Sequence, residues 1–151
     1  MSLFGSKDEK TKMSEKYGKR IMAAMSKYVG GNLSLSPNED IEIICYEKGI
    51  ALHPAKYFLN YENDEFITYD RLQPTSFKTE EQISKDVTLT RLLLVGIFAF
   101  GLKKKRVTHE QYLIINYDKE SNGIFQIPKL YINIVAKINE ARSKYLSSFS
   151  G

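Results

Sequence analysis

The first part of the chain alternates apolar and polar residues with the period of an α-helix. Over Lys7–Tyr28, apolar side chains recur at steps of three and four, with Lys, Glu and Arg between them. This spacing predicts an amphipathic helix, which Gly30 and Gly31 would end. We expect it to pack on the rest of the protein rather than to act as a detachable arm. Residues 1–30 are thus predicted to be a tail and helix ahead of a domain at 31–151.

From Leu33 the apolar period changes to two, which indicates β-strands. Ile41–Tyr46 and Ile50–His53 alternate in this way on either side of Glu47-Lys48-Gly49, and they predict a hairpin. Further short β-prone runs follow, separated by polar turns, and they predict an antiparallel meander. These runs are Tyr57–Leu59, Phe66–Tyr69, Thr75–Phe77 and Gln82–Lys85.

The segment Val87–Leu102 interrupts this rhythm because it is apolar on every face. It predicts a short buried helix with Thr88 or Thr90 as its N-cap, and a strand is the alternative. The basic run Lys103–Arg106 follows, and cations suit the C-terminal end of a helix. Residues 87–106 are therefore interpreted as an apolar insertion with a basic end.

The last third of the chain predicts a second hairpin and a closing helix. Glu110–Tyr117 and Ile124–Ile127 have strand character, and Asp118–Gly123 joins them as a turn. Beyond Pro128, at the expected first helical position, apolar residues recur at three and four over Tyr131–Phe149. The whole pattern predicts an α+β fold: an antiparallel β-barrel of about seven strands with an N-terminal helix and a C-terminal capping helix.

Length and cysteine content agree with one intracellular domain. The 151 residues can bury a core without help from disulfides or metals, and Cys45 has no second cysteine to pair with. The longest apolar stretch, Leu92–Leu102, has eleven residues, whereas a helix needs roughly 20 to span a bilayer. A cytoplasmic protein is expected. The alternative is a cytoplasmic protein that binds the membrane surface peripherally.

The net charge of +4 lies entirely in the first 29 residues, which hold seven Lys/Arg and three Asp/Glu. The rest of the chain is neutral but segregated, with acids concentrated between Glu39 and Asp86 and bases after Arg91. Nucleic-acid-binding domains usually carry their basic excess on the folded domain itself. Nucleic acid is therefore not an expected partner.

Three sequence segments resemble the small bacterial pleckstrin-homology-like (PH-like) domains of the YokE-like type, found in Gram-positive bacteria and their prophages. They are Glu47-Lys48-Gly49-Ile50-Ala51-Leu52, Phe66-Ile67-Thr68-Tyr69-Asp70-Arg71-Leu72, and Thr90 to Phe100 followed by Lys103-Lys104-Lys105. The resemblance covers about residues 33–146. It implies a PH-like fold that serves as a non-catalytic interaction module, in some members as a homo-oligomer.

The resemblance also implies a possible setting and excludes one ligand. A prophage-borne module of this kind would bind or inhibit a host protein. Eukaryotic PH domains that bind phosphoinositides carry clustered bases around their first hairpin loop. Here the loop Glu47-Lys48-Gly49 is short and has one base, so phosphoinositide recognition is not expected.

Candidate catalytic groups are few, and no enzyme activity, cofactor or metal is expected. His53 and His109 are interpreted as strand-end or loop residues, and Cys45 as a small core residue. The chain has no glycine-rich phosphate loop, no metal-spaced Cys/His cluster and no nucleophile elbow. The spacing of Asp118, Glu120 and Asn122 approaches that of a calcium loop, but Lys129 stands where a bidentate Glu is needed, so a hairpin turn is favoured.

The sharpest binding hypothesis concerns the apolar segment and its basic end. Its candidate binding residues are Arg91, Leu94, Phe98, Phe100, Lys103, Lys104, Lys105 and Arg106. We favour packing of this segment on the barrel or across a homo-oligomer interface. The alternatives are peripheral contact with an anionic membrane, which an apolar wedge beside four cations would suit, and an exposed groove for another protein.

Overall fold

The computed structural model describes residues 12–92 and 111–150. Seven strands of this part form one antiparallel sheet in the order β4-β3-β2-β1-β7-β6-β5. The strands are β1 (Arg20–Gly31), β2 (Asp40–Tyr46), β3 (Gly49–Pro54), β4 (Glu65–Thr68), β5 (Ser76–Lys78), β6 (Gln111–Tyr117) and β7 (Ser121–Ile127). The helical elements are η1 (Ala55–Tyr57), α2 (Glu80–Lys85), α3 (Val87–Leu92), η2 (Lys129–Tyr131) and α5 (Ile134–Ser150), and residues 12–17 are also helical.

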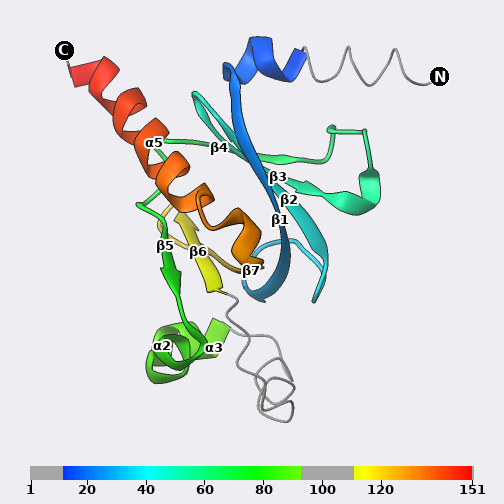
Figure 1. The fold of residues 1–151 in the computed structure, drawn as a ribbon, viewed down its shortest axis with the longest axis vertical. Helices are drawn as coiled ribbons and strands as arrows, with labels where there is room; N and C mark the ends of the chain where they lie inside the picture. Colours follow the sequence, from blue (N-terminus) through cyan, green and yellow to red (C-terminus); the bar gives the residue numbers. More distant parts are fainter. Residues whose placement is uncertain (1–11, 93–110, 151) are drawn as a thin grey trace.

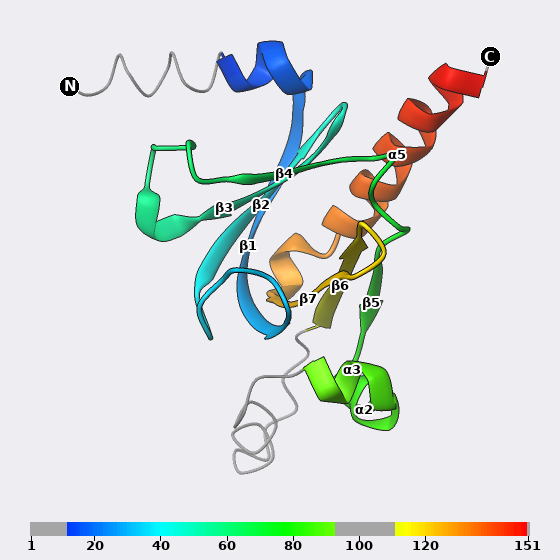
Figure 2. The ribbon, with the colours of Figure 1, turned by 180° about the vertical axis from the view of Figure 1, so that it is seen from behind.

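The sheet curls into a partly open barrel, with α5 lying across it (Figure 1). One core cluster joins side chains from both halves of the sheet, among them Ile43 of β2 and Leu113 of β6. Seen from behind, α5 crosses the open side of the curled sheet, where it contacts β1, β2 and β3 (Figure 2). This arrangement confirms the predicted α+β fold of PH-like type.

The helix α5 is held by a narrow apolar stripe. Ile134, Ile138 and Ala141 fall at steps of four and three, and all three are buried in the main core. Burying each of the two isoleucine side chains contributes about 1.5–3 kcal/mol. The stripe fixes α5 on the barrel and leaves its two flanks free for other contacts.

The predicted helix over Lys7–Tyr28 is wrong in its length. Residues 12–17 are helical, but Gly18 has a φ of +87° and the chain then enters β1, which pairs with both β2 and β7. The predicted domain boundary at residue 30 consequently falls inside the central strand. The apolar steps of three and four misled the prediction because β1 also exposes apolar side chains on its outer face.

The helical residues 12–17 pack on the outer face of the first four strands, as expected for a docked helix. Met13 and Tyr17 join a small outer cluster with Tyr46 and Phe66. The rings of Tyr17 and Phe66 stack with centroids 3.5 Å apart. The sheet is therefore covered on both faces in this region.

Two predicted strands are helical instead. Gln82–Lys85 belongs to α2, because Thr79 accepts a hydrogen bond from the Gln82 amide while the Gln82 side chain accepts one from Thr79, a complete capping box. The run Tyr57–Leu59 is no strand either, because Tyr57 ends η1 and the next two residues form a turn. The capping box is visible as Thr-x-x-Gln in the sequence, and it outweighs the β propensity of a four-residue run.

The remaining predictions agree more closely with the structure. Both hairpins are confirmed, as β2–β3 and β6–β7. The segment from Val87 is helical as far as Leu92, but α3 begins at Val87, so the predicted caps Thr88 and Thr90 lie within the helix. Pro128 precedes η2 rather than α5, which begins six residues later.

Candidate functional site

The binding residues proposed from the sequence lie mostly outside the described part. Arg91 is exposed on α3, at the end of the molecule away from the C-terminal half of α5 (Figure 1). The other seven candidates, from Leu94 to Arg106, fall outside the described residues. The described part of the structure therefore does not test the predicted site.

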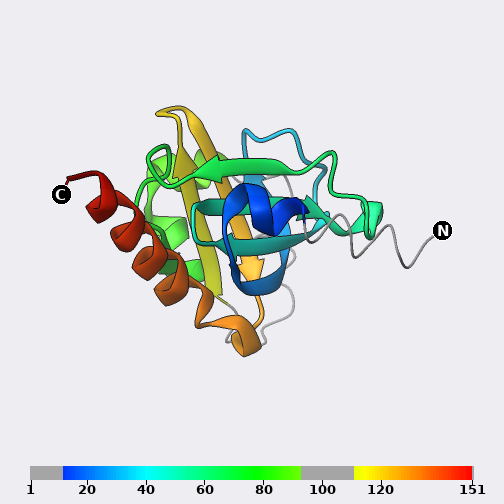
Figure 3. The ribbon, with the colours of Figure 1, turned by 90° about the horizontal axis from the view of Figure 1, so that it is seen from above.

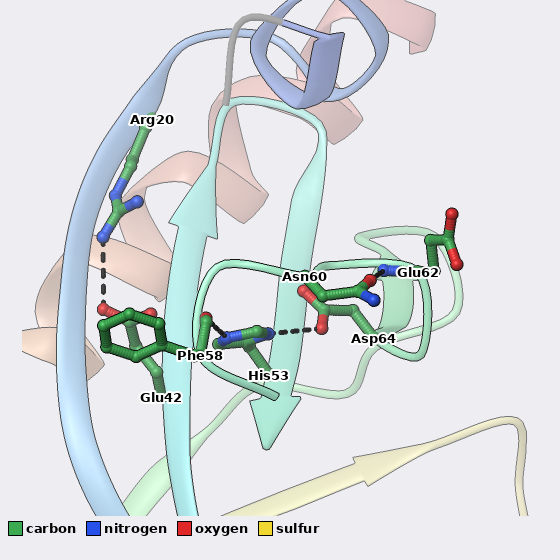
Figure 4. Close-up of polar contacts among 7 residues, drawn as sticks. All are labelled: Arg20, Glu42, His53, Phe58, Asn60, Glu62 and Asp64. Atoms are coloured by element: carbon green, nitrogen blue, oxygen red, sulfur yellow. Dashed lines mark hydrogen bonds and ion pairs between the residues drawn. The ribbon is translucent and has the colours of Figure 1, made fainter. Parts of the chain in front are cut away.

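His53, on β3, is the centre of a buried polar cluster at the connection between β3 and β4 (Figure 4). Its Nδ1 lies 2.6 Å from Asp64 Oδ1, and its Nε2 lies 2.6 Å from the carbonyl oxygen of Phe58. The ring of Tyr61 covers it, with centroids 4.4 Å apart. Because His53 is 2% exposed, both contacts are shielded from water.

The geometry gives His53 a structural role rather than that of a general base. A carbonyl can only accept, so Nε2 carries a proton, and Nδ1 faces a carboxylate. Burial lowers the pKa of His53, but the hydrogen bonds to Asp64 and Phe58 together outweigh it and raise this pKa above 6.5. Neither ring nitrogen is free to take a proton from a substrate.

The His53 cluster fixes the connection between β3 and β4. Phe58 has a φ of +53°, a left-handed value that is unfavourable for a residue with a Cβ, and its carbonyl is held by His53. Within the same connection, the Asn60 side chain accepts from the Glu62 amide. These contacts hold residues 55–64 against the sheet in one conformation.

Cys45 lies on the other face of the sheet, in the main core, as the alternation predicted. Burial raises the pKa of its thiol, and its Sγ lies 3.3 Å from the Tyr69 hydroxyl. A protonated, enclosed thiol is a poor nucleophile. Cys45 and His53 are consequently separated by the sheet and share no cleft.

The segment that resembles a calcium loop is a hairpin turn, as predicted. Asp118 connects β6 to β7, and its two carboxylate oxygens accept from Arg71 at 2.8 and 2.6 Å. In residues 12–92 and 111–150, no three His, Cys, Asp or Glu side chains are grouped to hold a metal ion.

Loops at one end of the barrel enclose a polar pocket of about 470 Å³. It is lined by the carboxylates of Glu39, Glu65 and Asp118, and Lys56 lies 3.2 Å from Glu39. Arg71 reaches Asp118 and Glu65 from the side. With three carboxylates and one lysine in its wall, this pocket is acidic.

A second hollow, the α5 groove, has a volume of about 510 Å³ and lies between α5 and the start of β1. The helix diverges from β1 towards its C-terminal end, both from the front and from above (Figures 1 and 3). The turn between β2 and β3 forms the floor. The groove is lined by Ile21, Glu47, Lys48, Lys137, Glu140, Ala141, Lys144, Tyr145, Ser148 and Phe149.

Apolar side chains are displayed in this groove without cover from the described part of the chain. Ile21 is 41% exposed and Phe149 is 72% exposed, and Phe149 meets Tyr145 edge to face with centroids 4.9 Å apart. Exposed aromatic and aliphatic side chains around a hollow are typical of protein-binding sites. The sequence could not reveal this site, because its lining comes from residues 21–48 and 137–149, which are distant in the chain.

The opposite flank of α5 is closed by hydrogen bonds. Asn139 Oδ1 accepts from the Thr75 amide at 3.1 Å and from its hydroxyl at 3.0 Å, while Asn139 Nδ2 donates to the Thr75 carbonyl at 3.1 Å. Arg142 Nε donates to the Leu72 carbonyl at 2.8 Å. The chain leading into β5 is thus tied to α5, and the groove towards β1 is the accessible side of the helix.

No protein-family model matches this chain, and no curated protein is similar to it. None of the helices in the described ranges has the length and apolar character needed to cross a membrane.

Proposed function

We propose that this chain is a non-catalytic, PH-like protein-interaction module whose partner docks in the α5 groove. The observation that supports this most is the exposure of Ile21 from β1 and Phe149 from α5 in the lining of one open hollow. Burying two such side chains against a partner would contribute several kcal/mol to binding.

The state of the reactive groups also favours binding over catalysis. Both nitrogens of His53 are engaged, and the Cys45 thiol is enclosed. The resemblance to YokE-like domains adds a bacterial or prophage setting, in which the module binds or inhibits a host protein.

Affinity purification from the cells that produce the protein tests this proposal. Ile21→Asp/Phe149→Asp removes the apolar character of the groove, and Leu130→Asp is the matched control, since Leu130 is 81% exposed on η2 outside it. Mass spectrometry should identify the same partner with wild type and with the control, and the groove variant should lose it. Equal recovery by all three forms would contradict the proposal.

The alternative is peripheral membrane binding through residues 92–102 and the basic run 103–106, which Arg91 precedes. Sedimentation with phosphatidylglycerol-containing vesicles decides between the two. We expect wild-type protein to stay in the supernatant at physiological salt. Salt-sensitive pelleting that disappears when Lys103–Arg106 are neutralised would favour the membrane instead.

A further inference from the structure

The first half of β1 has a neighbouring strand on one side only. Arg20–Lys27 pairs with β2 along its whole length, whereas the pairing with β7 begins at Lys27. Continuing this register would place Ile127, the last residue of β7, opposite Ser26, and Pro128 opposite Met25; Pro128 has no N–H, and there the chain turns into η2. In the described part of the protein, the other edge of residues 21–25 therefore has no strand beside it.

The direction of the backbone groups along this edge follows from Tyr28. Its amide donates to the Glu39 carbonyl and its carbonyl accepts from the Asn38 amide, so Tyr28 faces the β2 side. Groups on an antiparallel strand alternate in direction. Ala24 and Ser26 therefore also face β2, and the N–H and C=O groups of Ala23 and Met25 face the open edge.

This edge is protected only in part. Exposed edges are commonly guarded by charged residues, but the outward side chains here are Ile21, Ala23 and Met25. Pro128 lies beside Met25 at one end of the edge, and α5 contacts β1, so the accessible stretch is the part next to the α5 groove. A bulge at Ile21 is the single interruption in the pairing with β2. The edge ends at the α5 groove on one side and at a smaller hollow of about 150 Å³ beside Met25 on the other.

The charges of the groove favour an acidic occupant. Glu47 already accepts from the Lys19 amide at 2.7 Å, and Glu140 pairs with Lys144 at 3.5 Å. Lys48 and Lys137 also line the groove, and among the described residues neither ammonium group has an ion-pair partner. With three lysines and two glutamates, the groove lining has a net charge of +1, and Lys48 and Lys137 are the lysines available to a ligand.

We propose that an extended, acidic segment of a partner protein binds here by adding a strand to the open edge of β1. Its backbone pairs with Ala23 and Met25, its apolar side chains contact Ile21, Tyr145 and Phe149, and its carboxylates face Lys48 and Lys137. This mode rests on the proposed function and specifies its partner. A second copy is a poorer occupant, because a symmetric pair would bring these lysines towards each other.

Displayed peptide libraries provide the probe. Two libraries of twelve-residue segments share alternating apolar positions and differ at the polar ones, with Asp, Glu, Ser and Thr in the first and Lys, Arg, Ser and Thr in the second. We expect the full-length protein to enrich binders from the first library alone. Lys48→Glu/Lys137→Glu should weaken the best peptide by about tenfold or more, and Lys119→Glu/Lys129→Glu, outside the groove, should not.

Strand addition has a signature that side-chain docking lacks. N-methylation of the peptide at alternate positions should weaken binding by about tenfold or more for one parity and by less than about threefold for the other, since only one set of amides faces β1. Bound peptide should slow hydrogen exchange of the Ala23 and Met25 amides and leave that of Ala24, already bonded to β2, unchanged.

Each other outcome overturns the inference. No enrichment from the acidic library, or equal tolerance of both methylation parities, excludes strand addition, and the proposed function still stands if the groove variant loses its cellular partner. If the groove variant keeps that partner, the proposed function fails as well. A dimer in sedimentation that Phe149→Asp splits would assign the groove to a second copy, and groove-dependent pelleting with anionic vesicles would assign it to a membrane.

Discussion

The two flanks of α5 differ in how they use the same helix. On the flank towards β5, Asn139 and Arg142 satisfy backbone groups of residues 72–75 and close the surface. On the flank towards β1, side chains of similar spacing leave a hollow with exposed Ile21 and Phe149. The difference lies in what the barrel offers: a loop with unpaired backbone groups on one side, and a strand edge beyond the end of β7 on the other.

This contrast separates stability from binding along one element. Polar contacts of the closed flank satisfy groups that would otherwise be buried without partners, so they contribute to folding. The exposed apolar side chains of the open flank change the free energy of unfolding little. They contribute to the free energy of binding only when a partner buries them. Substitutions on the closed flank should therefore lower stability, whereas substitutions on the open flank should weaken binding.

The largest effect is expected where both flanks meet the core. Ile138→Asp places a carboxylate among fully buried side chains and should lower the free energy of unfolding by about 3–5 kcal/mol. Val135→Asp, at a half-buried position, should cost less. Ala136→Asp, exposed on the same helix, is the control, and chemical denaturation measures all three. Near-native stability of Ile138→Asp would contradict the packing of α5.

A smaller loss is expected from the closed flank alone. Asn139→Ala leaves the amide, carbonyl and hydroxyl of buried Thr75 without their partner and should cost about 1–3 kcal/mol. Lys144→Ala on the open flank removes an exposed ion pair and should cost less than about 0.5 kcal/mol. Equal losses for the two variants would remove the distinction between the flanks.

A pH titration sharpens the comparison, because the closed flank uses groups that do not titrate near neutrality and the His53 cluster does. The folded-state pKa of His53 is raised, so its contribution is fully present below 6.5, the unfolded value, and is lost as pH rises through the folded pKa. Wild-type stability should therefore fall over that interval relative to His53→Gln. Asn139→Ala should show the same pH slope as wild type, and a slope that survives in His53→Gln would show that another group is responsible.

The smallest effect on stability is expected on the open flank. Phe149→Asp should change the free energy of unfolding by less than about 0.5 kcal/mol, because the ring is mostly in water already. Thermal unfolding measures this directly. Destabilisation by more than about 2 kcal/mol would mean that Phe149 is part of the core, and the groove would then be a packing feature rather than a docking site.

How far the sequence predicts the structure depends on how local each signal is. The hairpins at Glu47-Lys48-Gly49 and at Asp118 were predictable, since short polar turns between alternating segments specify them. The strand β1 was not predictable, because the exposed residues Ile21 and Met25 are apolar although they lie outside the core. Together with their neighbours they have the spacing of an amphipathic helix. Only the inward set, from Met22 to Tyr28 at period two, reports the strand.

The α5 groove was beyond sequence reasoning for a related reason. Its lysines, Lys48 and Lys137, become neighbours only through the crossing of α5 over the turn between β2 and β3. The open edge of β1 depends on where a different strand ends, at Pro128. The sequence did indicate that no familiar catalytic motif is present, and it directed attention to a segment, Leu92–Arg106, that lies mostly outside the described residues.

The reactivity of the enclosed Cys45 thiol reports how often the barrel opens. Cys45 is the one cysteine of the chain, it has no exposed surface, and burial raises its pKa, so an alkylating reagent cannot reach a reactive thiolate while the barrel is closed. The rate of alkylation in native buffer consequently measures how often β2 separates from the core. A partner strand that clamps β1 from its open edge would lower that rate, without any label being introduced.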